Sequence, residues 1–243
     1  MKLEVCAADP QSLAAAIEGG AERIELCSAL ELGGLTPLPG LMALAAESGL
    51  ETFALVRPRS GDFVFDSHDL DAMLRDIAAV RQSGLTGVVL GANHADGTLD
   101  NVTLARLLDE AQGLGTTLHR AIDLVPDFAE ATEAAIALGF DRILTSGGAP
   151  TALEGLGQLA LVHATARGRI QVMAGSGLRP DNVLDLLAAV PVDEVHSSCA
   201  GEQTPSAEGA VRLGFAAKTR RHTDAAVVRA LRDRLAGWTA NSR

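Results

Sequence analysis

The chain has 243 residues, of which 47% are hydrophobic and 3% aromatic, and a formal net charge of −11. This length suits one (β/α)₈ barrel of about 250 residues, and the aliphatic content suffices for a large core. The acidic balance argues against a nucleic acid partner, and the lack of an apolar span of about 18 residues argues against a membrane protein.

Short apolar or β-branched runs alternate along the chain with longer Ala- and Leu-rich stretches, which is typical of successive βα units and a parallel sheet. The pattern predicts an α/β fold, a single (β/α)₈ TIM barrel over about residues 1–200 with a C-terminal loop and capping helix in 201–243. The eight expected strand cores are residues 3–6, 23–27, 52–56, 87–90, 116–119, 142–145, 170–174 and 192–196.

Helix-capping residues stand between these strands. Asp9-Pro10 predicts the start of the first helix, Asp100 the fourth, and Arg179-Pro180-Asp181 the seventh, where proline suits the first turn. After the eighth strand we expect a loop over 201–209 and an amphipathic closing helix over 224–235.

Two segments, GAERIEL at 20–26 and GFDRILT at 139–145, run from a helix end into a strand at matching offsets. They open the second and sixth units. Two stacked half-barrels would produce such a repeat.

Side chains alternate between the two faces of a strand, so the residue pattern predicts which ones face the barrel axis. In the second strand Ile24 and Leu26 should face the helices, which leaves Glu25 and Cys27 on the axis side. In the first strand the same alternation leaves Glu4 and Cys6 on the axis side. We therefore expect the two thiols at equivalent heights on neighbouring strands.

Polar residues gather where the strands end. The alternation turns His119, His196 and Ser198 inward at strand C-terminal ends. In a (β/α)₈ barrel, polar groups at this end usually serve chemistry. Further charged residues follow the third and fifth strands, namely Arg57, Arg59, Arg120 and Asp123.

The N-terminus, MKLEVCAADP, enters a strand-like run without the apolar stretch and cleavage site of a signal peptide. Cys6, Cys27 and Cys199 are widely spaced and form no disulfide framework. We expect a cytoplasmic protein with free thiols that serve packing, metal binding or nucleophilic chemistry.

Six motifs in this order resemble those of the CutC family. They are GGAERIELC at 19–27, GGLTP at 33–37, RPRSGDF at 57–63, LHRAID at 118–123, LTSGG at 144–148 and DEVHSS at 193–198. The resemblance implies a (β/α)₈ barrel, a cytoplasmic location and assembly into a homodimer or higher homo-oligomer. It also implies Cu(I) binding by the cysteines matched here by Cys6 and Cys27.

The chain departs from the family pattern in three places. AGSGL at 174–178 replaces a more glycine-rich run, and Leu118 and Ile122 stand where the family usually has Phe. The tail after Cys199 matches poorly, so the resemblance gives Cys199 no role.

Copper binding has a physical basis, because soft thiolates select Cu(I) and adjacent strands lie about 5 Å apart. Cys6 and Cys27 are one βα unit apart and could hold one ion between them. The alternative is that both pack as small, buried hydrophobic residues.

An anion site is a second hypothesis. Gly175, Ser176 and Gly177 after strand seven, with His196 and Ser198 at strand eight, occupy the place where barrels often bind phosphate through backbone amides.

Further groups would strengthen that site. Ser146 and Gly147 add donors, and Arg57, Arg59 and Arg120 would make a locally positive rim in an acidic protein. The alternative is that the glycines only let the chain turn, while the arginines pair with acidic residues, namely Glu25, Asp62 or Asp123.

Acid–base catalysis is a third hypothesis, because an enclosed site could separate the pKa values of Glu25, His119 and Asp123. The alternative is that each histidine is a hydrogen-bonded structural residue.

The leading hypothesis is a cytosolic CutC-family protein that binds Cu(I) through Cys6 and Cys27 in copper homeostasis. The rival is a TIM-barrel enzyme that acts on a small phosphorylated or carboxylated metabolite, with a small anionic molecule in place of copper as its partner. A third reading is an assembly scaffold, which would leave the surplus of polar groups at the strand ends without a purpose.

Overall fold

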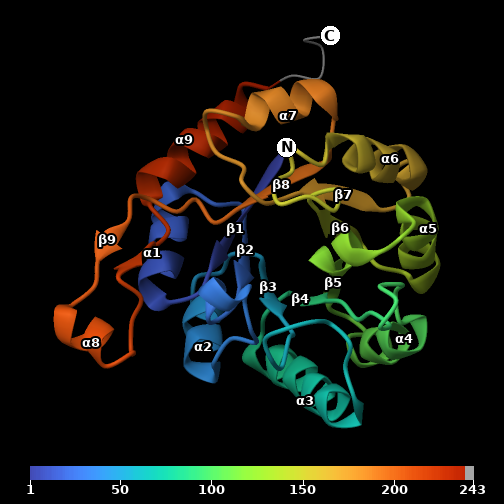
Figure 1. Ribbon diagram of the computed structural model, residues 1–243, viewed down its shortest axis with the longest axis horizontal. Coiled ribbons are helices and arrows are strands. Elements are labelled where there is room, and N and C mark those ends of the chain that lie inside the picture. The colour runs from blue at the N-terminus through green and yellow to red at the C-terminus, as the bar shows by residue number, and fades with distance from the viewer. Residues whose placement is uncertain (239–243) are drawn as a thin grey trace.

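The computed structural model describes residues 1–238, which form a closed barrel of eight parallel strands in chain order, ringed by helices (Figure 1). The barrel closes where β8 pairs in parallel with β1. The strands are β1 (Lys2–Ala7), β2 (Arg23–Leu26), β3 (Thr52–Leu55), β4 (Gly87–Leu90), β5 (Gly115–Leu118), β6 (Arg142–Thr145), β7 (Gln171–Ala174) and β8 (Glu194–Ser197). The predicted (β/α)₈ barrel and its eight strands are confirmed.

The surrounding helices are α1 (Pro10–Gly19), α2 (Pro39–Glu47), α3 (Ser67–Ser83), α4 (Asn101–Glu110), α5 (Phe128–Leu138), α6 (Leu156–Ala166), α7 (Val183–Ala189) and α9 (Ala225–Ala236), with 3₁₀ turns η1 (Leu30–Leu32) and η2 (Arg120–Leu124). The predicted caps Asp9 and Asp100 are confirmed, because each side chain accepts a backbone N–H of the first turn. Within residues 1–238, no helix combines the length and apolarity needed to cross a membrane.

The predicted start of the seventh helix at 179–181 is wrong. The backbone N–H of Arg179 donates to Asn182 Oδ1 at 2.8 Å, and Asn182 Nδ2 donates to the Gly177 carbonyl at 2.9 Å. These two bonds hold a turn, so α7 begins only after Asn182.

The chain leaves the barrel after β8 in an excursion that contains β9 (Thr204–Pro205), α8 (Glu208–Arg212) and β10 (Thr219–Arg220). Figure 1 shows α8 on the outer side of α1, away from the barrel. The loop predicted over 201–209 is therefore partly wrong, because the antiparallel pairing of β9 with β10 is too short to leave a periodic signal. The predicted closing helix is confirmed as α9, and residues 239–243 of the expected C-terminal segment lie outside the described residues.

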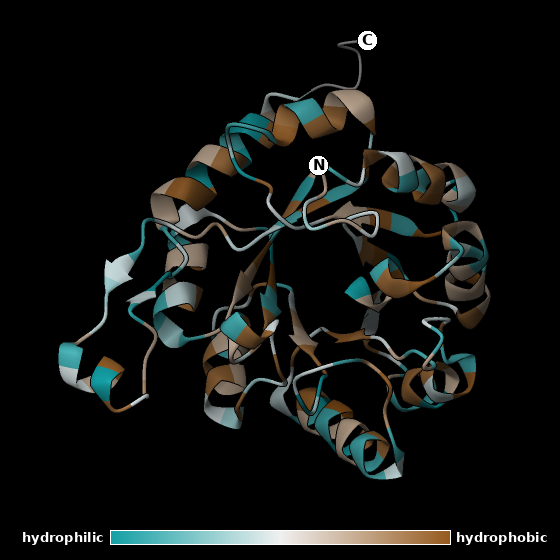
Figure 2. Ribbon diagram, in the orientation of Figure 1, coloured by the Kyte–Doolittle hydropathy of each residue, from teal (hydrophilic) through white to brown (hydrophobic). Residues whose placement is uncertain are grey.

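Apolar side chains fill the space between strands and helices, and Figure 2 shows hydrophobic colour along the strands. Ile24 and Leu26 are fully buried in this outer core, as their alternation predicted. Inside the barrel, Cys27 packs in a separate small cluster with Phe53 and Val89.

A buried ion network fills the N-terminal part of the barrel interior. Arg23 Nε donates to Glu4 Oε2 at 2.5 Å, and a second Arg23 nitrogen donates to Glu194. Arg142 Nε donates to the same Glu194 oxygen at 2.6 Å. Both guanidinium groups lie over the Phe53 ring, 5.4 and 5.1 Å from its centroid. Each buried charge therefore has an opposite partner.

The sequence repeat accounts for part of this network. Gly20 and Gly139 end α1 and α5 in the left-handed region, with φ of 85° and 86°. Arg23 and Arg142 follow them at the same offset, and both reach Glu194. The two repeat copies thus place equivalent cations on one carboxylate.

Glu194→Gln should destabilise the fold strongly, because the amide cannot balance the charges of Arg23 and Arg142. We expect the free energy of unfolding in urea to fall by about 3–5 kcal/mol. The matched control is Glu133→Gln, which breaks an exposed pair with Arg169 and should leave stability nearly unchanged. Equal stability of Glu194→Gln and wild type would contradict a structural role for the network.

Candidate functional site

A cavity of about 470 Å³ opens at the C-terminal ends of the strands. Its lining residues lie at the ends of seven strands, all but β4, or in the segments that follow them, as expected for the working face of a (β/α)₈ barrel. Predicted site residues that line it are Cys6, Glu25, Cys27, Arg57, His119, Arg120, Ser176, Gly177, His196 and Ser198.

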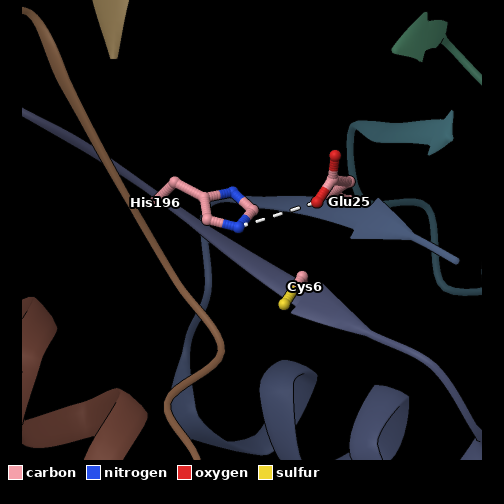
Figure 3. A group of neighbouring side chains, drawn as sticks. All are labelled: Cys6, Glu25 and His196. Atoms are coloured by element: carbon pink, nitrogen blue, oxygen red, sulfur yellow. Dashed lines mark ion pairs between the residues drawn. The ribbon is translucent and has the colours of Figure 1, made fainter. Parts of the chain in front are cut away.

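Three polar side chains form a chain across neighbouring strands at the base of this cavity. His196 Nδ1 lies 2.8 Å from Glu4 Oε1, and His196 Nε2 lies 3.6 Å from Glu25 Oε2. Figure 3 shows His196 and Glu25 directed toward each other, with the Cys6 sulfur beside them. One ligand atom from each of Cys6, Glu25 and His196 lies within 4.8 Å of the others.

Burial and neighbouring charges shift the pKa values of Glu4, His196 and Glu25. Burial raises the pKa of Glu4, but the His196 hydrogen bond and Arg23 outweigh it and lower the pKa to about 2. Burial lowers the pKa of His196, but Glu25 and Glu4 outweigh it and raise the pKa. Burial, helped by the Glu4 charge, raises the pKa of Glu25 to about 7. Glu25 can therefore gain or lose a proton near neutral pH.

The two inward cysteines differ in position. The strand register places Cys6 beside Glu25, and Cys27 lies two residues further along, where its N–H donates to the Ala7 carbonyl at 3.0 Å. The expectation of equivalent heights is therefore wrong. It assumed that Cys6 lies opposite Cys27, whereas the register of β1 against β2 places Cys6 opposite Glu25. Burial raises the pKa of both thiols. The charge of Cys27 raises the pKa of Cys6 further, and the charge of Glu25 raises the pKa of Cys27 further. Both are thiols at neutral pH.

Arg57 is bound by backbone carbonyls rather than by an acid. Nη1 donates to Leu32 O and Gly34 O at 2.9 Å each, and Nη2 donates to Gly61 O at 2.7 Å. Its Nε is buried without a hydrogen-bond partner. Arg57 forms no ion pair with Glu25 or with any other acid in residues 1–238, so its charge is uncompensated there.

His119 is held as a neutral hydrogen-bond donor. Its Nδ1 accepts the Ala121 N–H at 3.1 Å, which leaves the proton on Nε2, and Nε2 is buried without a partner. Burial and the Arg57 charge lower the His119 pKa to about 3. The acid–base hypothesis grouped Glu25 with His119. In the structure the histidine beside Glu25 is His196 instead.

Asp123 ties the loop after β6 to the loop after β5. Its Oδ1 accepts from Ser146 N at 3.1 Å and from Thr145 Oγ1 at 2.5 Å, and its Oδ2 accepts from Arg120 Nε at 2.6 Å. Gly147 N donates to Thr145 Oγ1 at 2.9 Å. The amides of Ser146 and Gly147 are therefore used within the fold, and these two residues lie outside the cavity lining with Asp123.

Two further predicted anion-binding residues also serve local structure. Gly175 N donates to the Thr145 carbonyl at 3.1 Å, which continues the pairing of β6 with β7. Arg59 donates to Asp69 at 2.8 Å and to Asp62 at 3.1 Å, outside the cavity lining.

Several residues that line the cavity or support it were not predicted as site residues. Arg179, Arg221, Phe63 and Cys199 line the cavity, and Glu4 holds His196 from below. Strand alternation could have found Glu4, which it placed on the axis side. Arg221 carries no such signal, because it returns to the cavity from the excursion after β8.

Comparisons with known proteins agree on one family. The sequence profile described as the CutC family matches residues 1–201. A CutC family protein of Rhizobium meliloti (strain 1021) is 54% identical over 235 residues, which cover 97% of this chain and 96% of that protein. One from Caulobacter vibrioides (strain NA1000 / CB15N) is 54% identical over 212 residues, 87% of this chain and 86% of that protein.

A solved structure has the same fold. The crystal structure of CutC from Streptococcus agalactiae, described there with a proposed role in copper homeostasis, has a TM-score of 0.77 and 29% identity. It covers 82% of this chain and 98% of that one.

The proton on Glu25 should make stability fall as pH rises. The folded pKa, about 7, lies above the usual 4.5, so the folded state binds this proton more tightly than the unfolded state. This contribution is complete below about pH 4.5 and is lost as pH rises through about 7. Glu25→Gln lacks it, so urea unfolding should show the variant gaining stability relative to wild type over this range. Parallel stability curves would contradict the raised pKa.

Proposed function

The chain belongs to the CutC family, and from this premise we propose that it is an enzyme that transfers a proton to or from a small anionic metabolite at the mouth of its barrel. The observation that carries the proposal is the Glu4–His196–Glu25 chain at the base of the cavity. Acid–base catalysis is most effective when the pKa of the catalytic group lies near the working pH, and Glu25 meets this condition.

Each member of the chain has a separate task. Glu25 exchanges the proton with the substrate, because it lines the cavity. His196 lies between the two carboxylates and stabilises the ionised form of Glu25. Glu4 is a positioning residue, since its hydrogen bond fixes the His196 ring and its charge favours the imidazolium.

The charges around the cavity favour an anionic substrate. Arg57, Arg120, Arg179 and Arg221 line it, and Glu25 is the only acid among the described residues that do so. In a protein with a net charge of −11, this is a local reversal of sign that would attract an anion.

A two-stage experiment tests the proposal. Small phosphorylated and carboxylated metabolites are first screened for those that raise the melting temperature, and each one found is then incubated with the protein in D₂O. We expect NMR to show exchange of a carbon-bound proton for deuterium. Glu25→Gln and His196→Asn should slow this exchange by about 10²-fold or more.

Glu133→Gln is the matched control, because it makes the same change in an exposed carboxylate that pairs with Arg169 outside the cavity, and it should keep the exchange rate. Binding without exchange in the wild type, or equal exchange in Glu25→Gln, would rule out this function.

Cu(I) binding is a second candidate, favoured by one specific observation: Cys6 and Cys27 line the same cavity, close enough for the charge of Cys27 to raise the pKa of Cys6 further than burial alone does. Copper would be the cargo, held by soft thiolates. The ion would have to displace both thiol protons, against the burial and the Glu25 charge that favour the protonated forms.

Copper binding is tested by titrating Cu(I) under anaerobic, reducing conditions against a chromophoric Cu(I) chelator. We expect about one Cu(I) per chain, lost in Cys6→Ser and in Cys27→Ser because a hydroxyl is a hard ligand. Cys199→Ser is the matched control, since Cys199 is a third buried thiol of the same cavity and should matter less. Undiminished binding in the Cys6→Ser/Cys27→Ser double variant would rule out this pair.

A further inference from the structure

We propose that Arg57 and His119 form a subsite for a carboxylate, so that the substrate is a small carboxylic acid held by one guanidinium N–H and one imidazole N–H. This inference rests on the proposed function and names the class of its substrate.

Two buried donors without acceptors mark this subsite. Among the described residues that line the cavity, only Arg57 Nε and His119 Nε2 are buried polar side-chain atoms without a hydrogen-bond partner. Each of the two residues is 5% exposed. Buried donors are normally satisfied, so two of them in residues that line one cavity indicate a missing acceptor.

Neither donor can readily turn to another partner. The three carbonyl bonds to Nη1 and Nη2 fix the Arg57 guanidinium and leave Nε free. The Ala121 N–H fixes the His119 ring through Nδ1. Phe63 lies against both groups. Its ring centroid is 4.7 Å from the His119 ring centroid and 5.1 Å from Arg57 Cζ. The pair is therefore rigid before any ligand arrives.

The charge of the pair matches a carboxylate. Arg57 contributes one positive charge that only neutral carbonyls surround, and His119 is neutral, so one negative charge balances the subsite. A planar carboxylate can accept one N–H on each oxygen, and bonds to a charged donor are the stronger kind.

A phosphate group fits this side of the cavity less well. Phosphate sites in barrels rely on free backbone amides. The Ser146 and Gly147 amides offer no such site, because they are bonded to Asp123 and Thr145 and lie outside the cavity lining. The nearby Arg120 is already paired with Asp123. A phosphate dianion held by Arg57 and His119 would therefore meet one positive charge and two N–H donors.

Ligand-observed NMR titration tests the subsite, with pyruvate and inorganic phosphate as probes. We expect pyruvate to bind the wild-type protein more tightly than phosphate does. Arg57→Lys, which removes Nε–H but keeps the charge, and His119→Phe, which removes the imidazole donor, should each weaken pyruvate binding about tenfold or more. His119→Gln retains an N–H and should restore part of the loss.

Arg59→Gln is the matched control, because Arg59 lies two residues from Arg57 but pairs with Asp62 and Asp69 outside the cavity. It should leave pyruvate binding unchanged. Should Arg57→Lys fail to fold, the comparison of His119→Phe with His119→Gln still decides the matter. Tighter binding of phosphate, or equal pyruvate binding in His119→Phe and wild type, would overturn the subsite.

The two proposals can fail separately. Pyruvate binding is read without turnover, so an intact subsite with no proton exchange would remove the proposed function alone. If a ligand exchanges its proton but binds the Arg57→Lys and His119→Phe variants as tightly as wild type, the subsite alone would be ruled out.

Discussion

The carboxylate of Glu4 connects the structural and the chemical halves of this barrel. One oxygen accepts a hydrogen bond from Arg23, and the other lies 2.8 Å from His196 Nδ1. Because Arg23 and His196 keep Glu4 ionised, its charge is available to hold the imidazolium and to raise the pKa of Glu25. Loss of Glu4 would therefore disturb both the buried ion network and the proton chain above it.

The barrel axis changes character from one end to the other. At the N-terminal end, Arg23, Arg142 and Glu194 satisfy one another, as suits a region that serves stability. At the C-terminal end, Arg57 and His119 each keep a donor without an acceptor. A buried donor without an acceptor costs stability. Unpaired donors at the C-terminal end of the barrel would suit a site where a ligand supplies the acceptor.

The proposed proton transfer and metal binding would compete for the same atoms in this cavity. The Cys6 sulfur lies within 4.8 Å of ligand atoms of Glu25 and His196. A cation held there would favour the ionised carboxylate and the neutral imidazole, the reverse of the proton distribution set by Glu4. The two proposed uses of the site would therefore exclude each other.

The sequence by itself determined the features that depend on local chemistry. The eight strands, the caps Asp9 and Asp100, and the inward direction of Glu25 and His196 followed from hydrophobic periodicity and side-chain alternation. Only the tertiary structure decided the register that sets Cys6 beside Glu25. Periodicity shows which face a residue occupies, but the offset between strands depends on how whole units pack.

The loops were decided in the same way by contacts that are remote in sequence. Arg57 binds carbonyls of Leu32, Gly34 and Gly61 rather than an acid, and Asp123 closes the loop after β6 rather than facing the cavity. The sequence showed that charged residues would stand at the mouth. It could not show which of them would find a partner, because hydrogen bonding there depends on where separate loops return in space.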